Sequence, residues 1–172
     1  PGEKMLFRHP PRSLPPGERR NAVEQVLGGA LAAVRPDLAI ERAVRREGGD
    51  LVIAGERYPL DGLGRIRVLG VGKAAAPMVR PLWELLGDRL DGCVVIGKRG
   101  EPTEAFGGDA VEFLDGAHPI PDRDSVVVAQ RAMDFVSPLG PDDLLMVAIS
   151  GGTSALLTLP APGLELAAIS AT

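Results

Sequence analysis

The sequence predicts a three-layer α/β domain with a mainly parallel, Rossmann-like sheet, and three observations support this. Short apolar runs alternate with helix-forming stretches along most of the 172 residues. The runs at 66–71, 92–96 and 144–149 lack the alternating polar positions of a half-exposed strand, which indicates burial on both faces. The apolar residues are mostly Ala, Val and Leu, and only 3% of the chain is aromatic. Small side chains of this kind suit buried parallel strands packed against helices.

The first third of the chain predicts an arm, a helix and a hairpin. Residues 1–20 are rich in Pro and Arg and are expected to form an extended arm without a core. Apolar side chains recur at helical spacing over 21–34, and Arg35-Pro36 should end that helix, because a residue before proline is disfavoured in the α conformation. Two short strands, at 51–54 and 57–60, are joined by Gly55-Glu56. This pattern indicates a hairpin.

Strands and helices then alternate. We expect strands at 66–71, 92–96, 110–114 and 144–149, and helices over 74–86 and 122–135. Because strand–helix–strand units form crossover connections, the four strands should be mainly parallel neighbours in one sheet. Residues 164–172 resemble the first turns of a helix that is cut short. The sequence is therefore expected to be a piece of a longer protein, with 21–172 forming an α/β domain.

Composition excludes several classes of function. A net charge of −4 and few aromatic residues argue against a nucleic-acid partner. No apolar run approaches the roughly 18 residues of a membrane span, and no signal peptide is evident. The single cysteine, Cys93, lies in an apolar run and is expected to be a buried, inert thiol in a cytoplasmic protein. One cysteine and two histidines do not make a zinc site.

The first candidate site is LGVGKAAAPM, residues 69–78. Gly70 and Gly72 permit close approach of the backbone, and Lys73 lies where the strand turns into a helix. There it could neutralise a phosphate or carboxylate beside the free N–H groups of the helix. The spacing matches neither a Walker A loop nor the dinucleotide fingerprint. A tightly packed turn with a solvent-facing lysine is the alternative.

The second candidate is GAHPIPDRDS, residues 116–125. Two prolines stiffen this connection and would hold the His118 imidazole in one orientation, as an acid, a base or a donor to a substrate oxygen. A structural histidine bonded to a nearby carbonyl is an equal alternative. Asp122, Asp124 or Ser125 should cap the helix that follows.

The third candidate is the loop after the last strand, Ser150 to Ser154. Successive N–H groups of Gly151, Gly152 and Thr153 can form a nest for an anion, and Ser150, Thr153 and Ser154 add hydroxyl donors. A glycine turn with Thr153 as an N-cap is the alternative. Two further charged pairs are not expected to bind a ligand. Lys98-Arg99 should form a solvated loop, although it could lie at the ligand edge of the sheet. Asp142-Asp143 should be solubilising loop charges, and Mg²⁺ binding there is unsupported.

The segments VGKAAAPM, HPIPDRDS and DDLLMVAISGGTSALLTLPAPGLEL, in this order, resemble the N-terminal domain of the glycerate 2-kinases of the MOFRL family. Members of that family have also been labelled hydroxypyruvate reductases. The resemblance extends from about residue 21 to residue 172. It implies two α/β domains with the active site between them, so that this chain is an N-terminal fragment. Such a fragment is not expected to turn over alone.

The resemblance also implies a reaction and roles for residues. The family transfers the γ-phosphoryl group of ATP to the 2-hydroxyl of D-glycerate, giving 2-phosphoglycerate and using Mg²⁺. Lys73 matches the lysine after the first glycine-rich turn, and the Ser150–Ser154 loop matches the phosphate or substrate loop. Two alternatives stay open: an NAD(P)H-dependent hydroxypyruvate reductase, and a non-catalytic module that binds phosphate or a phosphosugar. A homo-oligomer is allowed, since the sequence does not fix the oligomeric state.

Overall fold

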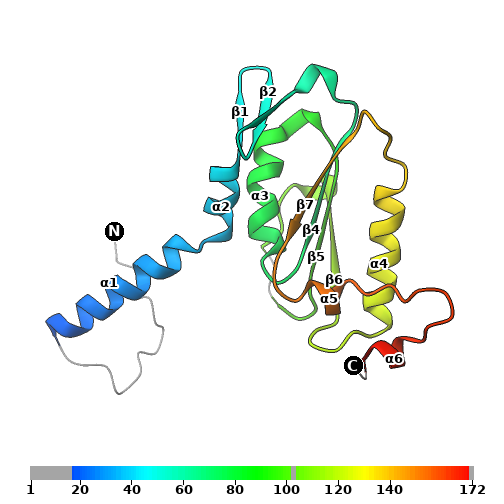
Figure 1. The fold of residues 1–172 in the computed structure, drawn as a ribbon. Helices are drawn as coiled ribbons and strands as arrows, with labels where there is room; N and C mark the ends of the chain where they lie inside the picture. The colour runs from blue at the N-terminus through cyan, green and yellow to red at the C-terminus, as the bar shows by residue number, and fades with distance from the viewer. Residues whose placement is uncertain (1–16, 102–103, 171–172) are drawn as a thin grey trace.

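The structure is a computed structural model that describes residues 17–101 and 104–170. Its main body is a four-stranded sheet covered by helices on both faces, with a smaller three-stranded sheet beside it (Figure 1). Most of the predicted arm, residues 1–16, lies outside the described residues. Among the helices of the described ranges, none is long and apolar enough to cross a membrane.

The large sheet is entirely parallel and has the strand order β6-β5-β4-β7. The central strand β4 (Ile66–Val71) pairs with β5 (Leu90–Lys98) on one side and with β7 (Leu144–Ile149) on the other, while β6 (Val111–Gly116) pairs with β5. The predicted parallel sheet is therefore confirmed, and its strands begin or end within a few residues of the predicted bounds.

Helices α3 (Ala75–Leu86) and α4 (Arg123–Val136) lie on opposite faces of this sheet, with the short α5 (Thr153–Leu156) on the same face as α4 (Figure 1). Alternate residues of β5 point to the two faces: Cys93 and Val95 pack in the core under α3, and Val94 and Ile96 in the core under α4. Both faces of β5 are thus buried, which explains its unbroken apolar run.

The α4 helix begins where the sequence predicts it. Asp122 is the N-cap and accepts hydrogen bonds from the N–H groups of Asp124 (2.9 Å) and Ser125 (3.3 Å). The Ser125 hydroxyl accepts in return from the Asp122 N–H, which completes a capping box. The hydroxyl also accepts from the N–H of Ala117 at 3.1 Å. The cap therefore holds the chain on both sides of the two prolines.

The predicted hairpin is confirmed as β2 (Asp50–Ile53) and β3 (Glu56–Pro59), but it belongs to a larger unit. Two neighbouring elements were not predicted: helix α2 (Pro36–Ala43) and strand β1 (Val44–Glu47), which pairs antiparallel with β2. β1 buries a single residue, Val44, so its sequence carries little periodic signal. Short 3₁₀ turns occupy Leu60–Gly62, Gly87–Arg89 and Gly108–Ala110.

Helices were expected near both ends of the described chain, and the structure has both. Helix α1 (Glu18–Ala33) begins before the predicted start and projects away from the sheets (Figure 1). The final helix, α6 (Leu166–Ser170), agrees with the helical onset expected near the end of the chain.

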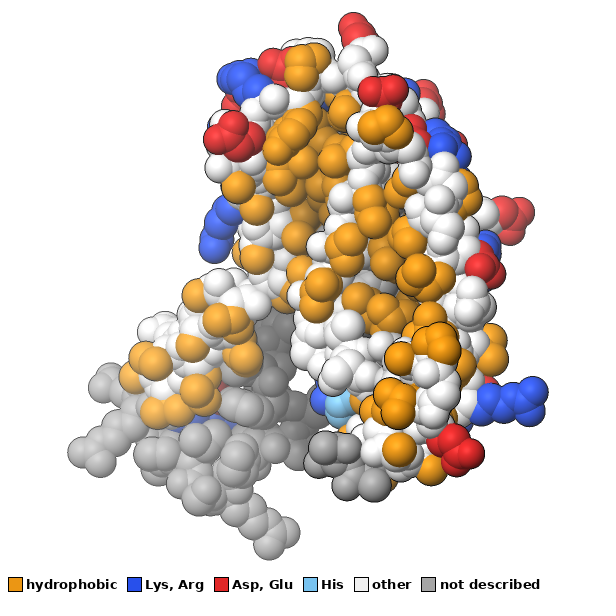
Figure 2. All heavy atoms as spheres, turned by 45° about the vertical axis from the view of Figure 1, so that its right-hand side comes forward, with side chains coloured by type: hydrophobic (Ala, Val, Ile, Leu, Met, Phe, Trp, Pro, Cys, Tyr) orange, Lys and Arg blue, Asp and Glu red, His pale blue; other side chains and the backbone are white. Residues whose placement is uncertain are grey.

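Apolar side chains gather on the face shown in Figure 2. The expectation that the run 144–149 is buried on both faces is wrong: in the edge strand β7, Val147 and Ile149 are 46% and 62% exposed, because α4 packs on β5 and β6 instead.

The expectation that Asp142-Asp143 are solubilising loop charges is wrong for Asp143. Its side chain is only 9% exposed and links the start of β7 to the start of β4. It accepts hydrogen bonds from the N–H groups of Gly140 (2.8 Å) and Arg65 (2.6 Å) and from the Arg65 guanidinium (2.7 Å). The Gly140 hydrogen bond, followed by those from Arg65, lowers the pKa of Asp143 to about 2.

Candidate functional site

The carboxyl ends of the four parallel strands lie at one edge of the large sheet, and every candidate segment follows one of them. From β4 the chain continues outward through β5 to β6, and then returns to place β7 on the other side of β4. The strand order thus reverses between β4 and β7. In open α/β sheets, ligands bind in the crevice at such a switch point.

The glycine turn after β4 lies in that crevice. Gly72 has a φ of +120°, and a Cβ there would overlap the Ser150 hydroxyl and lie 2.7 Å from the Ser150 carbonyl oxygen. Only glycine therefore allows the two loops to meet. Gly70 has a different role, because a Cβ there would overlap Val79 of α3. Gly70 serves strand–helix packing, as the alternative interpretation of this turn proposed.

The loop after β7 is fastened to the glycine turn by hydrogen bonds. The N–H of Ser150 donates to Val71 O (2.9 Å), and the N–H of Lys73 donates to Gly151 O (3.0 Å). The Ser150 hydroxyl accepts from the N–H of Ala74 at 3.0 Å. The two loops therefore form one rigid unit across the switch point.

Two of the predicted hydroxyl donors have partners within the protein. Thr153 Oγ1 donates to Ser150 O at 2.8 Å and lies 3.1 Å from Val71 O, and the Ser150 hydroxyl is held by Ala74. Helix α5 begins at Thr153 itself, after Gly152, so Thr153 is not its N-cap. The structure thus gives these two hydroxyls a positioning role, whereas Ser154 lies exposed at the start of α5.

Backbone donors of the same loop remain open. Within residues 17–101 and 104–170, the N–H groups of Gly151, Gly152, Thr153 and Ser154 donate to no acceptor. Gly152 is in the left-handed conformation, with a φ of +97°. Successive amides turned by such a residue form a concave, partly positive nest. The predicted cradle of N–H groups is therefore present in the structure.

The start of α3 is less available to an anion. The N–H groups of Lys73, Ala74 and Ala75 donate to Gly151 O, the Ser150 hydroxyl and Gly72 O. In the first turn Pro77 has no N–H at all. Lys73 therefore contributes its side chain rather than a helix terminus, in contrast to a nucleotide-binding loop of the Rossmann type.

His118 and Lys73 converge on Gly152. A Cβ built on Gly152 would lie 3.1 Å from His118 Cδ2 and 3.4 Å from Lys73 Cε. The His118–Pro119 peptide bond is cis. Lys73 is exposed and forms no ion pair with any carboxylate of the described residues. The structure thus brings the three predicted segments together at one edge, with an uncompensated cation beside the nest.

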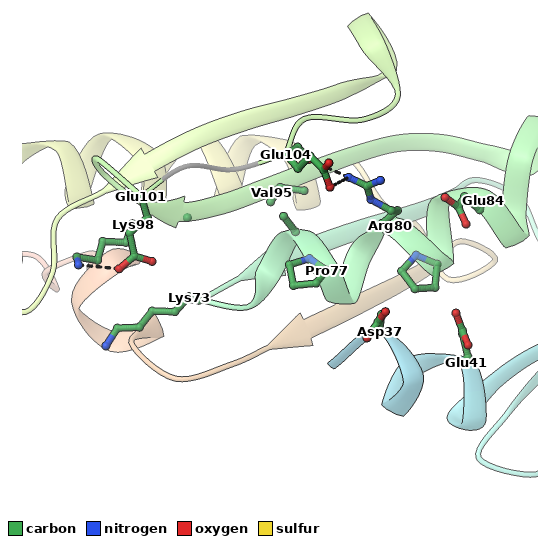
Figure 3. Close-up of a pocket in the computed structure, with 14 residues that line it drawn as sticks. Asp37, Glu41, Lys73, Pro77, Arg80, Glu84, Val95, Lys98, Glu101 and Glu104 are labelled. Atoms are coloured by element: carbon green, nitrogen blue, oxygen red, sulfur yellow. Dashed lines mark hydrogen bonds and ion pairs between the residues drawn. The ribbon is translucent and has the colours of Figure 1, made fainter. Parts of the chain in front are cut away.

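A hollow of about 500 Å³ runs from this edge along α3 toward α2 (Figure 3). Lys73 and Lys98 lie at one end of it, and Asp37, Glu41 and Glu84 at the other. Arg80 and Glu104 form an ion pair between the two ends, at 3.2 Å. The hollow is therefore polarised, with cationic groups next to the strand ends.

Lys98 was expected only to be part of a solvated loop, and Glu101 was not predicted to lie near the site. Lys98 is the last residue of β5, and its ammonium lies 2.7 Å from the Glu101 carboxylate inside the hollow. Its neighbour Arg99 fits the solvated-loop prediction, because it pairs with Asp122 and Asp124 on the surface. The available signal for Lys98 was its position just past an apolar strand.

Comparison with known proteins agrees with this fold. Residues 22–172 match the model of DUF4147, described as a domain of unknown function. The chain belongs to this family. It is similar to a glycerate 2-kinase from Pyrococcus horikoshii, with 31% identity over 142 residues that cover 83% of this chain and 31% of the relative. A relative from Agrobacterium vitis that bears the name of a hydroxypyruvate reductase is 40% identical over 105 residues, 61% of this chain and 26% of its own.

A crystal structure of a glycerate kinase from Thermotoga maritima has the same fold, with a TM-score of 0.68 and 29% identity over 84% of this chain and 31% of that one. The DUF4147 chain thus spans less than a third of the length of the relatives it matches. The resemblance seen in the sequence is confirmed at the level of the family and the fold.

Proposed function

We propose that the DUF4147 chain forms the N-terminal part of a glycerate 2-kinase, which transfers the γ-phosphoryl group of ATP to the 2-hydroxyl of D-glycerate. One observation carries the proposal: among the described residues, the ammonium of Lys73 has no carboxylate partner and lies beside the N–H groups of Gly151–Ser154, which donate to no acceptor. Both substrates are anions, and both need donors of this kind. Relatives named glycerate kinase support the same function.

The geometry suits phosphoryl transfer, in which positioning and charge stabilisation supply most of the catalysis. The nest would hold oxygen atoms of a phosphate or of the glycerate carboxylate. Lys73 would stabilise the charge that spreads over the transferring oxygens, and His118, next to Gly152, would donate a hydrogen bond to a substrate oxygen or accept a proton. The hydrogen bonds of Ser150 and Thr153 would keep the nest in shape.

The residues described here do not fit a magnesium site. Across 17–101 and 104–170, no group of three or more His, Cys, Asp or Glu residues is placed to hold a metal ion. The carboxylate of the hollow that lies nearest the two lysines, that of Glu101, is bonded to Lys98. Only the family resemblance therefore supports the use of Mg²⁺.

Reduction of hydroxypyruvate with a nicotinamide cofactor is less well supported. The Gly70-Val71-Gly72 turn lacks the third glycine of the dinucleotide fingerprint. The N–H groups at the start of α3, which would bind a pyrophosphate in that fold, are used by Ser150 and Gly151. A non-catalytic phosphate-binding module would need only the nest. The buried single cysteine supports a cytoplasmic location as part of the proposal.

The test is a coupled assay of the complete gene product with ATP, Mg²⁺ and D-glycerate, with NADH and hydroxypyruvate run beside it. We expect ATP-dependent formation of 2-phosphoglycerate and no oxidation of NADH. Turnover only in the nicotinamide reaction would contradict the kinase function and show that the protein is a hydroxypyruvate reductase. Binding of phosphate without either reaction would leave the binding module.

A further inference from the structure

A second lysine reaches the same end of the hollow as Lys73. In the register of the sheet, Val71 at the end of β4 is opposite Ile96 of β5, and β5 continues for two more residues to Lys98. The extra residues extend past the end of β4, where the N–H of Gly72 donates to Ile96 O at 3.1 Å. Both lysines line the hollow, so the strand register puts them side by side around one space (Figure 3).

Unlike Lys73, Lys98 already holds an anionic partner. Its Nζ lies 2.7 Å from Oε1 of Glu101, which also lines the hollow. The loop turns back on itself to allow this contact, with the N–H of Glu101 donating to Lys98 O and that of Arg99 to Gly116 O. A carboxylate from the protein itself therefore occupies the position in which a carboxylate or phosphate of a ligand would meet this ammonium.

Electrostatics couple Glu101 to the rest of the site. The hydrogen bond from Lys98 lowers the pKa of Glu101, and the positive charges of Lys98 and Lys73 lower it further. Glu101 is thus an anion in the field of the groups that converge on the nest. It is also free to move away: the side chains of Lys98 and Glu101 are 32% and 45% exposed, and ion pairs of this kind are weak.

We propose that Lys98 is a second anion-binding residue of this site, and that the Glu101 carboxylate holds it until an anionic ligand takes its place. The class of ligand, a phosphate or a small carboxylate, is taken from the proposed function, on which this inference rests. A dianionic phosphoryl group exchanges for the single charge of Glu101 with a net gain in attraction, whereas a monocarboxylate only replaces it. The pair therefore favours phosphoryl groups over simple carboxylates.

Arg80 and Glu104 provide a matched comparison within the same hollow. They form a similar ion pair, but the Arg80 guanidinium lies over the Phe106 ring, 5.2 Å from its centre, and lies farther along α3 from the lysines (Figure 3). Glu104 is 91% exposed. Glu104→Gln thus removes a carboxylate of the hollow without freeing a cation at the strand ends.

The test measures binding of inorganic phosphate to the complete gene product by calorimetry, without nucleotide or glycerate. We expect Lys98→Met to raise the Kd roughly 5-fold and Glu101→Gln to lower it roughly 3-fold, the effects of a single partly exposed charge. The double variant should lie close to Lys98→Met, because the Glu101 carboxylate acts mainly through the ammonium that it contacts. Glu104→Gln should leave the Kd unchanged, and thermal melts should show all variants folded.

Weaker or unchanged phosphate binding in a folded Glu101→Gln would overturn the proposal, as would a folded Lys98→Met with the unmodified Kd. Absence of phosphate binding by the unmodified protein would overturn it too. Because this readout uses neither ATP nor glycerate, it is separate from the kinase assay. The expected shifts in Kd without kinase turnover would remove the proposed function and keep the anion-binding role of Lys98.

Discussion

The two edges of the parallel sheet differ in how fully their polar groups are paired within the protein. At the amino edge, Arg65 pairs with Asp143, and Arg67 pairs with Asp91 at 2.8 Å while its guanidinium lies over the Phe135 ring. Arg89 donates to backbone carbonyls at the same edge. At the carboxyl edge, Lys73 has no carboxylate partner among the described residues, and the N–H groups of the neighbouring nest have no acceptor.

This difference separates structural from functional polar groups. A pair such as Arg65–Asp143, with a nearly buried carboxylate that also accepts from backbone N–H groups, contributes to folding and has no capacity left for a ligand, whereas the more exposed Lys98–Glu101 pair can open. An open cation beside unsatisfied amides contributes little to folding and can stabilise a bound anion. Substitutions of open charged side chains at the carboxyl edge should therefore change binding and turnover, whereas substitutions of paired charges at the amino edge should change stability.

The largest effect is expected for Lys73→Met in the complete gene product. Loss of the ammonium should lower kcat on the order of 100-fold, and more than it raises KM for glycerate, because its charge matters most as the transferring oxygens become more negative. The thermal midpoint should change little, since the side chain is exposed. Steady-state kinetics and a melt measure both quantities.

Lys73→Arg is the matched control for charge. A planar guanidinium does not place its charge where a compact ammonium does, so this variant should recover only part of the rate. Full turnover in a folded Lys73→Met would remove the residue from the mechanism. A large fall in the melting temperature of Lys73→Met would instead show that Lys73 stabilises the fold.

The next effect concerns the contact between the two loops. Gly72→Ala places a Cβ against Ser150 at a φ of +120°, so it should cost about 2 kcal/mol of unfolding free energy or more and reduce activity as the nest is displaced. Gly151→Ala is the control, because a Cβ there meets nothing within 4 Å and the N–H is kept. Denaturant titration should separate the two. Equal stability of both variants would contradict the close contact.

At the amino edge, Asp143→Asn should lower the melting temperature by several degrees and leave kcat nearly unchanged. The folded-state pKa of about 2 lies below the ordinary value of 3.8, so the carboxylate contributes stability above about pH 4 and loses it as the pH falls toward 2. Melts of the variant should lack this part of the acid dependence. Asp142→Asn, at an exposed neighbour, should keep the full profile.

The smallest effect is expected at Cys93. Burial raises the pKa of its thiol to about 12, so the reactive thiolate is nearly absent at pH 8. An aromatic disulfide reagent should therefore react with Cys93 only as the protein unfolds in denaturant. Rapid reaction in the folded protein, measured by absorbance, would show that the core under α3 opens.

The fold could be predicted because it depends on local patterns. Unbroken apolar runs and the Asp122 cap are local signals, and the structure has the buried strand β4 and the start of α4 where they were expected. Strand β7 is the exception, because the burial of its second face depends on where α4 packs. Strand β1 escaped prediction because only Val44 of it is buried. Asp143 was misjudged because its partner Arg65 is 78 residues away, and no local pattern reports such a contact.

For the site, the sequence by itself determined which residue types follow each strand: glycines and Lys73 after β4, His118 after β6, and two glycines among hydroxyls after β7. Only the tertiary structure decided which of their polar groups are used within the protein and which stay open. Ser150 and Thr153 bond to the protein while the amides of Gly151 and Gly152 stay open. The physical reason is that a donor's availability depends on what folding brings within hydrogen-bonding distance, and a residue's identity does not record that.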